Sequence, residues 1–366
     1  MKYSLVYLEG ITKMSRVING ISANTKVLTT EGFKEVINLS KDDIIVSENS
    51  IGATVLDIQE EGYSNTNYII LEDDRGVELA DNYQLDYVIA KSKPKLNTNT
   101  VDSINIPDNT FIKIKLIDSP YLITVNDSDL IPPYTMGVLL GNGYCNNYNL
   151  ELSSPYDEVY EKIEKELTDD KLRVSMVKEM QGTKRALIVR KEEYSRNREI
   201  KNSYREKYLS YGLGGLLANS KFIPDEYLYK INLKQRIDLI RGLLDTDGNV
   251  APSKSIRFNS VSYRLAKGLQ YLIWSIGGRC TLKKEIKSIY KENHQDLYWL
   301  YINYIDFIKL FTVSKKLDRL KDRRYLPNKD KWVKVSSIEK SDREVLTYSI
   351  TLDKDVRLIT DTYIGI

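Results

Sequence analysis

The spacing of hydrophobic and polar positions changes twice along this chain. Between residues 20 and 125, short runs rich in β-branched residues, such as TKVLTT and NYIILE, are separated by turn residues such as TEG and EDDRG. This pattern is typical of β-strands. From Pro132 onward helical and strand-like spacings alternate, and the segment VKVSSIEKSDREVLTYSITL, which begins at Val333, returns to a β pattern. We therefore expect an all-β part that a mixed part interrupts and the last residues complete.

The mixed part contains two stretches with a similar order of predicted elements. Helical spacing in the first places Val159, Ile163 and Leu167 on one face. Because the order recurs after about one hundred residues, we expect two copies of one supersecondary unit. The predicted elements are helix 156–167, strands 171–180 and 184–193 and helix 194–213 in the first copy, and strand 255–261, helix 262–278, strands 279–290 and 296–304 and helix 305–311 in the second.

Each copy is preceded by an apolar helix that ends in a glycine turn. The two segments are YTMGVLLGNG at 134–143 and DLIRGLLDTDG at 238–248. Gly137 and Gly242 would let two such helices approach closely, and the turns would then place positions 142 and 247 side by side. Two carboxylates there could share divalent metal ions, which polarise a phosphodiester and generate hydroxide.

For one segment alone, a plain helix with a glycine C-cap and Asp247 as a turn residue is the better interpretation. Two segments in matching contexts favour the paired site. In this chain the first copy carries Asn142 where a carboxylate is expected. Asparagine still offers a carbonyl oxygen to a metal ion, but it brings no charge and binds more weakly.

Composition narrows the class of protein. The chain has 366 residues, 29% of them charged, and no apolar run of membrane-spanning length or signal-peptide pattern. Its only cysteines are Cys145 and Cys280 and its only histidine is His294, which excludes a zinc finger and argues against a histidine-based triad. We expect a reducing, intracellular setting, cytoplasmic or nucleoid-associated.

The net charge of +3 is unevenly distributed along the chain. Residues 1–130 hold 12 Lys+Arg against 20 Asp+Glu, whereas residues 131–366 hold 42 against 31. A basic second part is typical of proteins that face nucleic acid. The alternative is an ordinary solvated, lysine-rich surface, and charge alone does not decide between the two.

The motifs themselves resemble a known family. IRGLLDTDG (240–248) resembles the signature of LAGLIDADG, or DOD-type, homing endonucleases, and TMGVLLGNG (135–143) resembles a degenerate first copy. SKFIPDEYL (220–228) and RFNSVSYRLAKGLQYLIWSIGGRC (257–280) resemble the segments that flank the second motif in intein-borne members. The resemblance implies a pseudo-twofold domain of two αββαββα repeats, whose two sheets form a saddle over a long DNA site. It implies catalytic roles for Asp247 and Lys221, with Asn142 as a degenerate counterpart, and Asp247 and Asn142 as metal ligands.

The flanking β segments resemble the splicing domain of an intein, the Hint fold. ISANTKVLTTEGFKEVINLSKDDIIVS (21–47), VELADNYQLDYVI (77–89) and TYSITLDKDVRLITDTYIGI (347–366) resemble three of its sequence blocks, in the right order. The resemblance places Gly20 where a nucleophilic Cys or Ser starts an intein, and Ala80 and Tyr83 where Thr and His belong. Glycine has no side chain for an acyl shift. We expect these positions, and a last residue Ile366 in place of His-Asn, to be vestigial.

The predicted organisation is therefore α+β, with a split Hint-like domain around an endonuclease-like domain. The expected bounds are an N-terminal extension at 1–19, Hint-like segments at 20–129 and 336–366, and a DNA-binding domain at 130–335. Basic residues and one asparagine on its strands are candidate contacts to bases and phosphates. These candidates are Lys171, Arg173, Lys184, Arg185 and Arg190 in the first half and Arg257, Asn259, Lys283, Lys284 and Lys287 in the second, with the basic run 316–324 behind them.

From these features we expect a monomer that binds double-stranded DNA sequence-specifically, cannot splice and is impaired in cleavage. Such a protein, of mobile-element or phage origin, would suit a domesticated transcription regulator. Magnesium would be needed only if cleavage activity remains, and no cofactor would be needed for binding. The first alternative is an active Mg²⁺-dependent homing endonuclease or nickase that tolerates Asn142, so whether the protein is an enzyme stays open. The second alternative, a self-splicing intein, is disfavoured by Gly20, Ala80 and Tyr83.

Overall fold

The computed structural model describes the chain in two compact units, which are treated separately. Unit 1 comprises Met1–Ile123 and Asn328–Ile366, and unit 2 comprises Thr124–Pro327. The functions expected for the Hint-like and DNA-binding domains remain predictions. The structure describes residues 5–8, 11–47, 52–89, 96–101, 112–115, 130–146, 148–180, 182–197, 199–285, 296–304, 306–321 and 332–366.

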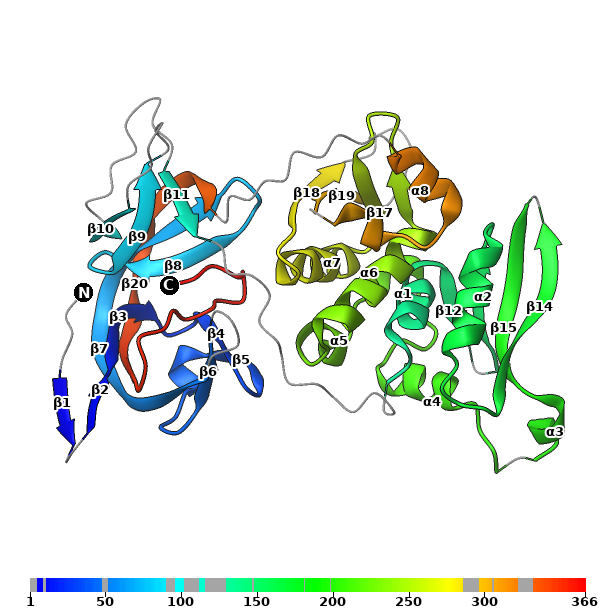
Figure 1. Cartoon of the computed structure of the whole chain (residues 1–366), viewed down its shortest axis with the longest axis horizontal. Helices are drawn as coiled ribbons and strands as arrows, with labels where there is room; N and C mark the ends of the chain where they lie inside the picture. The colour runs from blue at the N-terminus through cyan, green and yellow to red at the C-terminus, as the bar shows by residue number, and fades with distance from the viewer. Residues whose placement is uncertain are drawn as a thin grey trace. The chain divides into compact units, whose positions relative to one another are not determined.

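Unit 1 is a β unit (Figure 1). A short 3₁₀ helix, Val36–Asn38, and an antiparallel hairpin of β1 (Leu5–Leu8) with β2 (Ile11–Met14) lie outside its main sheet. The ten strands described in that sheet are β3 (Arg16–Ser22), β4 (Lys26–Thr29), β5 (Gly32–Glu35), β6 (Ile44–Val46), β7 (Gly52–Leu71), β8 (Gly76–Ala80), β9 (Gln84–Ile89), β10 (Leu96–Thr100), β11 (Ile112–Lys115) and β20 (Trp332–Leu352).

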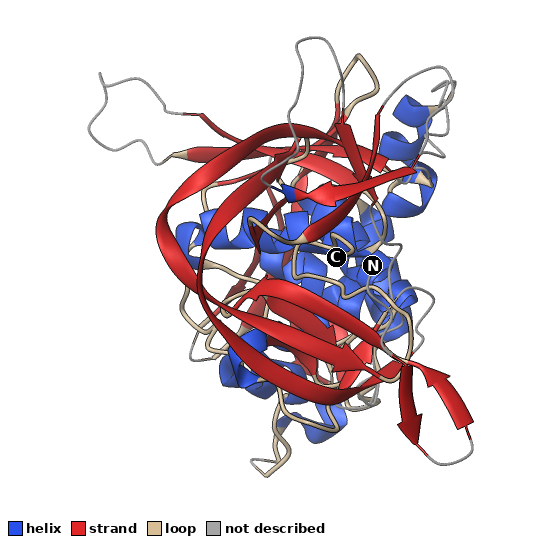
Figure 2. Ribbon diagram, turned by 90° about the vertical axis from the view of Figure 1, so that its left-hand side faces the viewer, coloured by secondary structure: helices blue, strands red, loops and turns tan. Residues whose placement is uncertain are grey.

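Residues from the two ends of the sequence complete the sheet of unit 1. The strand order is β10-β9-β11-β20-β3-β8-β7-β6-β4-β5, and β20 pairs antiparallel with β7 along most of its length. Figure 2 shows these long strands curving around the unit. The last residues turn back into the core, where Leu358, Ile364 and Ile366 are buried beside Val27. The interrupted β part is thus completed by the last residues, as expected.

Unit 2 begins with the first repeat. Its helix α1 (Pro133–Asn142) runs directly into a four-stranded antiparallel sheet of order β12-β13-β15-β14. Apolar residues alternate along these strands, so Leu150, Leu152, Ala186 and Ile188 are buried on one face and the other face stays open. The remaining elements are β12 (Gly143–Cys145), β13 (Leu150–Ser154), α2 (Asp157–Glu166), β14 (Leu172–Met180), β15 (Thr183–Arg190), α3 (Glu192–Ser195) and α4 (Ser203–Ser210).

The second repeat follows the same plan. A 3₁₀ turn, Ala218–Ser220, and α5 (Asp225–Tyr229) lead into α6 (Leu233–Thr246), which begins at a capping box of Asn232 and Gln235. The second sheet has the order β16-β17-β19-β18, which matches the first strand for strand. Its elements are β16 (Gly248–Val250), β17 (Ile256–Ser260), α7 (Tyr263–Ser275), β18 (Arg279–Glu285), β19 (Leu297–Asn303), a 3₁₀ helix Phe307–Leu310 and α8 (Ser314–Leu320).

The α+β class, with two αββαββα repeats in the mixed part, is confirmed. Local details differ from the sequence pattern. The helix expected at 194–213 is divided into α3 and α4, and the helix expected at 305–311 is a 3₁₀ turn followed by α8, which the pattern did not predict. The loop expected near residue 100 begins with strand β10. Among the described residues, none of the helices has both the length and the apolar character to cross a membrane.

Candidate functional site

The two repeats meet along α1 and α6, which lie side by side in Figure 1. Gly137 and Gly242 form the crossing point. A Cβ on Gly137 would lie 2.3 Å from the carbonyl oxygen of Leu239, and a Cβ on Gly242 would lie 2.2 Å from that of Tyr134. Because no side chain fits there, the two backbones touch directly, and the two helices end close together.

The ends of α1 and α6 bring together the residues that the motifs predict. Asp247 is the C-cap of α6, and Asn142 is the last residue of α1. Gly141, just before Asn142, has no side chain, and a Cβ there would lie 3.5 Å from Oδ2 of Asp247. The two positions are not equivalent in environment, because Asn142 is exposed whereas Asp247 is half-buried.

Lys221 lies beneath the end of α1. Its side chain is buried, and its Nζ donates hydrogen bonds to the carbonyl oxygens of Leu139 (3.1 Å), Gly141 (3.1 Å) and Gly143 (2.6 Å). The oxygens lie where α1 passes into β12, and helix-end carbonyl oxygens such as that of Gly141 need a donor from outside the helix. An ammonium group has three donors, so Lys221 is fully engaged as a cap of α1. In this geometry the predicted catalytic lysine has a positioning role.

Lys316, the first residue of the predicted basic run, does the same for α6. It is buried, and its Nζ donates to the carbonyl oxygens of Leu244 (2.7 Å), Asp245 (2.8 Å) and Gly248 (2.8 Å). The sequence interpretation placed it on a basic surface and missed this role. The available signal was the repeat itself, because a lysine that follows the second sheet as Lys221 follows the first is a candidate for the same position.

Burial and mutual electrostatic interaction shift the pKa values of Asp247, Lys221 and Lys316. Burial raises the pKa of the Asp247 carboxyl to about 6, although Lys221 and Lys316 lower it. Burial lowers the pKa of Lys221 to about 8 and that of Lys316 to about 8, and the negative charge of Asp247 opposes both shifts. The helix ends thus place one carboxylate near two ammonium groups, so the net charge of these three groups is positive at neutral pH.

Asp245, the other carboxylate of the motif, serves the fold. It is buried, accepts a hydrogen bond from the Tyr134 hydroxyl at 2.9 Å, and accepts the backbone N–H groups of Thr312 (3.0 Å) and Val313 (3.3 Å). All its polar contacts face inward. Burial nevertheless raises its pKa.

The donor set at the helix ends does not suit a divalent cation. Mg²⁺ and Ca²⁺ prefer several oxygen ligands that include carboxylates. Here one carboxylate is available, Asn142 is neutral, and Lys221 and Lys316 occupy the nearby backbone carbonyls. In the part of the chain that the structure describes, His, Cys, Asp and Glu side chains nowhere gather in threes to hold a metal ion.

The open faces of the two sheets carry some of the predicted DNA-contact residues. In the first sheet, Arg173 and Arg185 lie on the open face, and Arg185 forms an ion pair with Glu151. Lys184 lies on the helix-covered face, where it pairs with Asp157. Arg190 shares that face and donates to the carbonyl oxygens of Ser195 (3.1 Å), Asn197 (2.6 Å) and Ile200. Alternation along β15 therefore separates residues that the sequence interpretation had grouped.

The second sheet places Arg257, Asn259 and Lys283 on one open face. The strand register sets Arg257 opposite Tyr301, and both Asn259 and Lys283 opposite Trp299. Lys284 lies on the opposite side and forms a salt bridge with Asp296 at 2.7 Å. Three of the predicted residues are thus neighbours.

The other candidates lie elsewhere. Lys171 is exposed just before β14, and its N–H donates to Asp169 at 3.0 Å. Lys287 and residues 322–324 of the basic run lie outside the described residues.

The predicted vestigial splicing positions come together in unit 1. Gly20 lies in β3 with a φ of +71°, and its N–H donates to Glu61 at 2.8 Å. A Cβ there would meet Oδ1 of Asn82 at 2.9 Å, Cβ of Ala80 at 3.0 Å and Cβ of Tyr83 at 3.6 Å. Position 20 therefore lies beside positions 80 and 83, although it is 60 or more residues away from them in the sequence.

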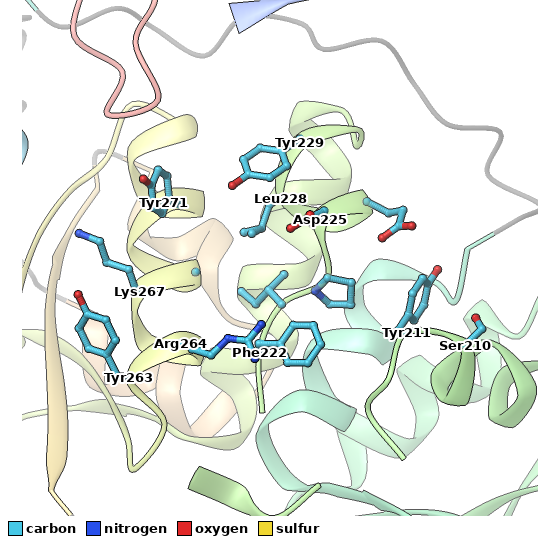
Figure 3. A pocket seen from close by; sticks show the side chains of 14 residues that line it. Ser210, Tyr211, Phe222, Asp225, Leu228, Tyr229, Tyr263, Arg264, Lys267 and Tyr271 are labelled. Atoms are coloured by element: carbon cyan, nitrogen blue, oxygen red, sulfur yellow. The ribbon is translucent and has the colours of Figure 1, made fainter. Parts of the chain in front are cut away.

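A separate surface groove lies between α5 and α7 in unit 2 (Figure 3). Arg264 covers the ring of Phe222, with its guanidinium carbon 4.2 Å from the ring centre. None of the residues predicted for catalysis, metal binding or DNA contact lines this groove. It therefore adds nothing to the site at the helix ends.

Two αββαββα repeats joined through a glycine-packed helix pair define unit 2 as a pseudo-twofold α+β domain. Residues 234–319 match the model of a LAGLIDADG-like domain. The recognition of a LAGLIDADG motif at 240–248 is confirmed, because it lies within the residues that match this domain model.

Parts of this chain are similar to known proteins. The chain is 31% identical over 160 residues to the replicative DNA helicase DnaB of Mycobacterium intracellulare, a match that covers 43% of this chain and 21% of that protein. A mesophilic variant of the homing endonuclease I-DmoI is 18% identical, covering 53% of this chain and 98% of its own, with a TM-score of 0.33. I-DmoI in complex with DNA and Ca is 17% identical, covering 53% of this chain and 98% of its own, with a TM-score of 0.34. The gp41-1 intein is 15% identical, covering 27% of this chain and 68% of its own, with a TM-score of 0.21.

Proposed function

We propose that unit 2 binds double-stranded DNA sequence-specifically, in the manner of a LAGLIDADG homing endonuclease whose catalytic site has decayed. The observation that carries the proposal is the pair of matched four-stranded sheets, each with one open face, on the shared α1–α6 pair. Sheets of this kind fit the major groove, where side chains meet base edges. The open face of the second sheet presents Arg257, Asn259 and Lys283 in neighbouring positions, residue types that suit guanine, adenine and phosphate.

Binding in this proposal needs no metal ion. Arg257 and Lys283 supply their own positive charge, and the helix ends hold Lys221 and Lys316 beside a single carboxylate. A site with two resident cations gains little from a third. The protein acts as a monomer in this proposal, because one chain already contains both repeats. Its proposed role is that of a DNA-binding regulator of intein-borne origin.

We also propose that this protein cannot carry out protein splicing. The acyl shift needs a side-chain nucleophile, and Gly20 has none. Beside Gly20, Ala80 lacks the hydroxyl of the threonine expected at its position, and Tyr83 lacks the imidazole of the histidine expected at its position. The β unit is then a retained scaffold.

The test is a selection of full-length protein on a pool of duplexes with a randomised core, carried out in EDTA. We expect one long motif to be enriched, with an affinity that falls linearly on a logarithmic scale as salt rises, because phosphate neutralisation releases counterions. Affinity should change little when magnesium replaces EDTA. Enrichment of no sequence over the starting pool would contradict the proposal.

The second candidate is a Mg²⁺-dependent endonuclease or nickase. The half-buried Asp247 at the helix ends favours it, because one carboxylate is retained beside the position of Asn142. The selected duplex decides between the two, since incubation with magnesium followed by denaturing electrophoresis reveals a cut in either strand. An intact duplex supports the DNA-binding role alone.

A further inference from the structure

The two sheets of unit 2 match residue by residue, which allows their open faces to be compared directly. Glu151 of β13 pairs with Tyr144 on one side and Leu187 on the other, and Arg257 of β17 pairs in the same way with Asn249 and Tyr301. The register therefore puts Glu151 and Arg257 at equivalent places in the two halves.

The outer strands of the two sheets are chemically alike. Arg173 on β14 corresponds to Arg279 on β18, because each lies opposite the last open-face residue of the neighbouring strand, Val189 and Asn303 respectively. Lys178 and Lys283 likewise lie two paired positions further along than Ser175 and Thr281. Like residues at matched positions predict like contacts with the two halves of a site.

The central strands are chemically opposite. Glu151 is paired with Arg185, so this part of the first sheet has no net charge. Arg257 instead lies over the ring of Tyr301, with its guanidinium carbon 5.3 Å from the ring centre, and Lys283 approaches the same ring at 5.7 Å. Stacking on Tyr301 holds two cations on the open face of the second sheet.

Each of these groups has its own preferred base edge. Arginine donates two parallel hydrogen bonds to O6 and N7 of guanine, whereas a carboxylate accepts from the amino group of cytosine. Arg185 approaches Oε2 of Glu151, and a carboxylate has several acceptor positions, so the ion pair does not use up Glu151. The hydrogen bond from Arg257 Nε to Ser255 at 3.2 Å fixes the arginine from behind and leaves its terminal nitrogens to the open face.

Resting on the proposed DNA-binding function, we propose that Arg257 and Glu151 are specificity-determining residues with opposite preferences. Arg257 selects guanine in the half-site under the second sheet, and Glu151 selects cytosine at the position related to it by the pseudo-twofold axis. The target is therefore not palindromic at this pair of positions, and the protein binds it in one orientation only.

The experiment compares the motif selected by the wild-type full-length protein with those selected by Arg257→Glu, Glu151→Arg and the double exchange. We expect guanine at one paired position and cytosine at the other for wild type when each half-site is read 5′ to 3′ from its own outer end, so that a single strand carries the same base at both positions. Each single exchange should convert its own half alone, and the double exchange should reverse both preferences. On fixed duplexes, replacing the guanine should weaken wild-type binding on the order of 10-fold, the range of one bidentate contact.

Matched controls separate specificity from general affinity. Lys178→Ala and Lys283→Ala should weaken binding by similar factors without changing the base at either paired position. The inference is overturned if wild type selects the same base at both paired positions when each half-site is read from its own outer end, which is a palindromic pair, or if the exchanges leave the selected bases unchanged. Absence of any selected motif would instead contradict the proposed DNA-binding function, so the two failures are distinguishable.

Discussion

Gly137 and Gly242 meet where α1 and α6 cross, and a Cβ built on either glycine would lie 3.0 Å from the Cα of the other. Both would also run into backbone, at Leu239 and Tyr134, which cannot rotate away. This contact sets the distance between the two repeats, and with it the separation of the helix ends and of the two sheets.

Gly137→Ala should therefore lower the free energy of unfolding by roughly 1–3 kcal/mol, because the extra methyl group forces the helices apart. In an open helix the same change usually stabilises by about 0.4–1 kcal/mol. Gly268→Ala on α7 is the matched control, since its Cβ would meet only the flexible Ile223 side chain at 3.2 Å. Urea denaturation of both variants gives the answer, and equal stabilities would contradict the prediction.

Lys221→Met and Lys316→Met should each destabilise the fold. Burial of the Lys221 charge costs about 3 kcal/mol, given a pKa lowered to about 8. Its removal takes one donor from the carbonyl oxygens of Leu139, Gly141 and Gly143, of which Leu139 keeps the N–H of Gly143, and each oxygen left without a donor costs about 1–3 kcal/mol. The expected net loss is roughly 1–4 kcal/mol in thermal or urea unfolding. Lys234→Met on the exposed side of α6 is the control, and unchanged stability of Lys221→Met would refute the capping role.

Asp247→Asn should gain stability relative to wild type as pH rises from 4 to 6.5. The folded-state pKa of Asp247, about 6, lies above the ordinary aspartate value of 3.8, so the folded state binds its proton more tightly than the unfolded state. Wild-type stability therefore falls as pH rises through this window, by up to about 3 kcal/mol, whereas asparagine does not titrate. Lys221 and Lys316 remain charged throughout it. Parallel unfolding curves at all pH values would contradict the assignment.

Asn142→Asp should create a divalent-metal site. A second carboxylate beside Asp247 adds one negative charge and repels it unless a cation lies between them. We expect Mn²⁺ binding to appear by titration calorimetry and magnesium-dependent cleavage of the selected duplex to rise. The double variant Asn142→Asp with Asp247→Asn should lose both while DNA affinity stays near wild type. If Asn142→Asp binds the duplex but gains no metal, the site has decayed beyond this residue.

The sequence predicted the architecture of unit 2 because its signals were local and repeated. Apolar helices that end in glycine at 143 and 248 report their own ends, and the recurrence of the pattern indicated two copies. The same reasoning predicts Asn142 and Asp247 as paired site residues, and the structure places each at the end of its motif helix. Alternation alone could not place Lys184 and Arg190, because neighbouring basic residues on a strand give no sign of which one faces the helices.

Other parts of the site depend on contacts that no local pattern encodes. Lys316 reaches the end of α6 from seventy residues further along the chain, and only the folded structure reveals that its charge is buried. Likewise, the opposition of Glu151 and Arg257 emerges when the registers of two sheets are superposed. Residue types were readable from the sequence, but the partners of each charge were set by tertiary packing.

The left-handed backbone at Gly20 limits the side chains that this position can accept. A codon change that placed cysteine or serine there would set a Cβ at a φ of +71°, with Asn82 Oδ1 only 2.9 Å away. Such a residue is strained before any chemistry begins. Recovery of a nucleophile would require the neighbouring turn to change at the same time. A single substitution at Gly20 would therefore not be enough to supply the side-chain nucleophile that an acyl shift needs.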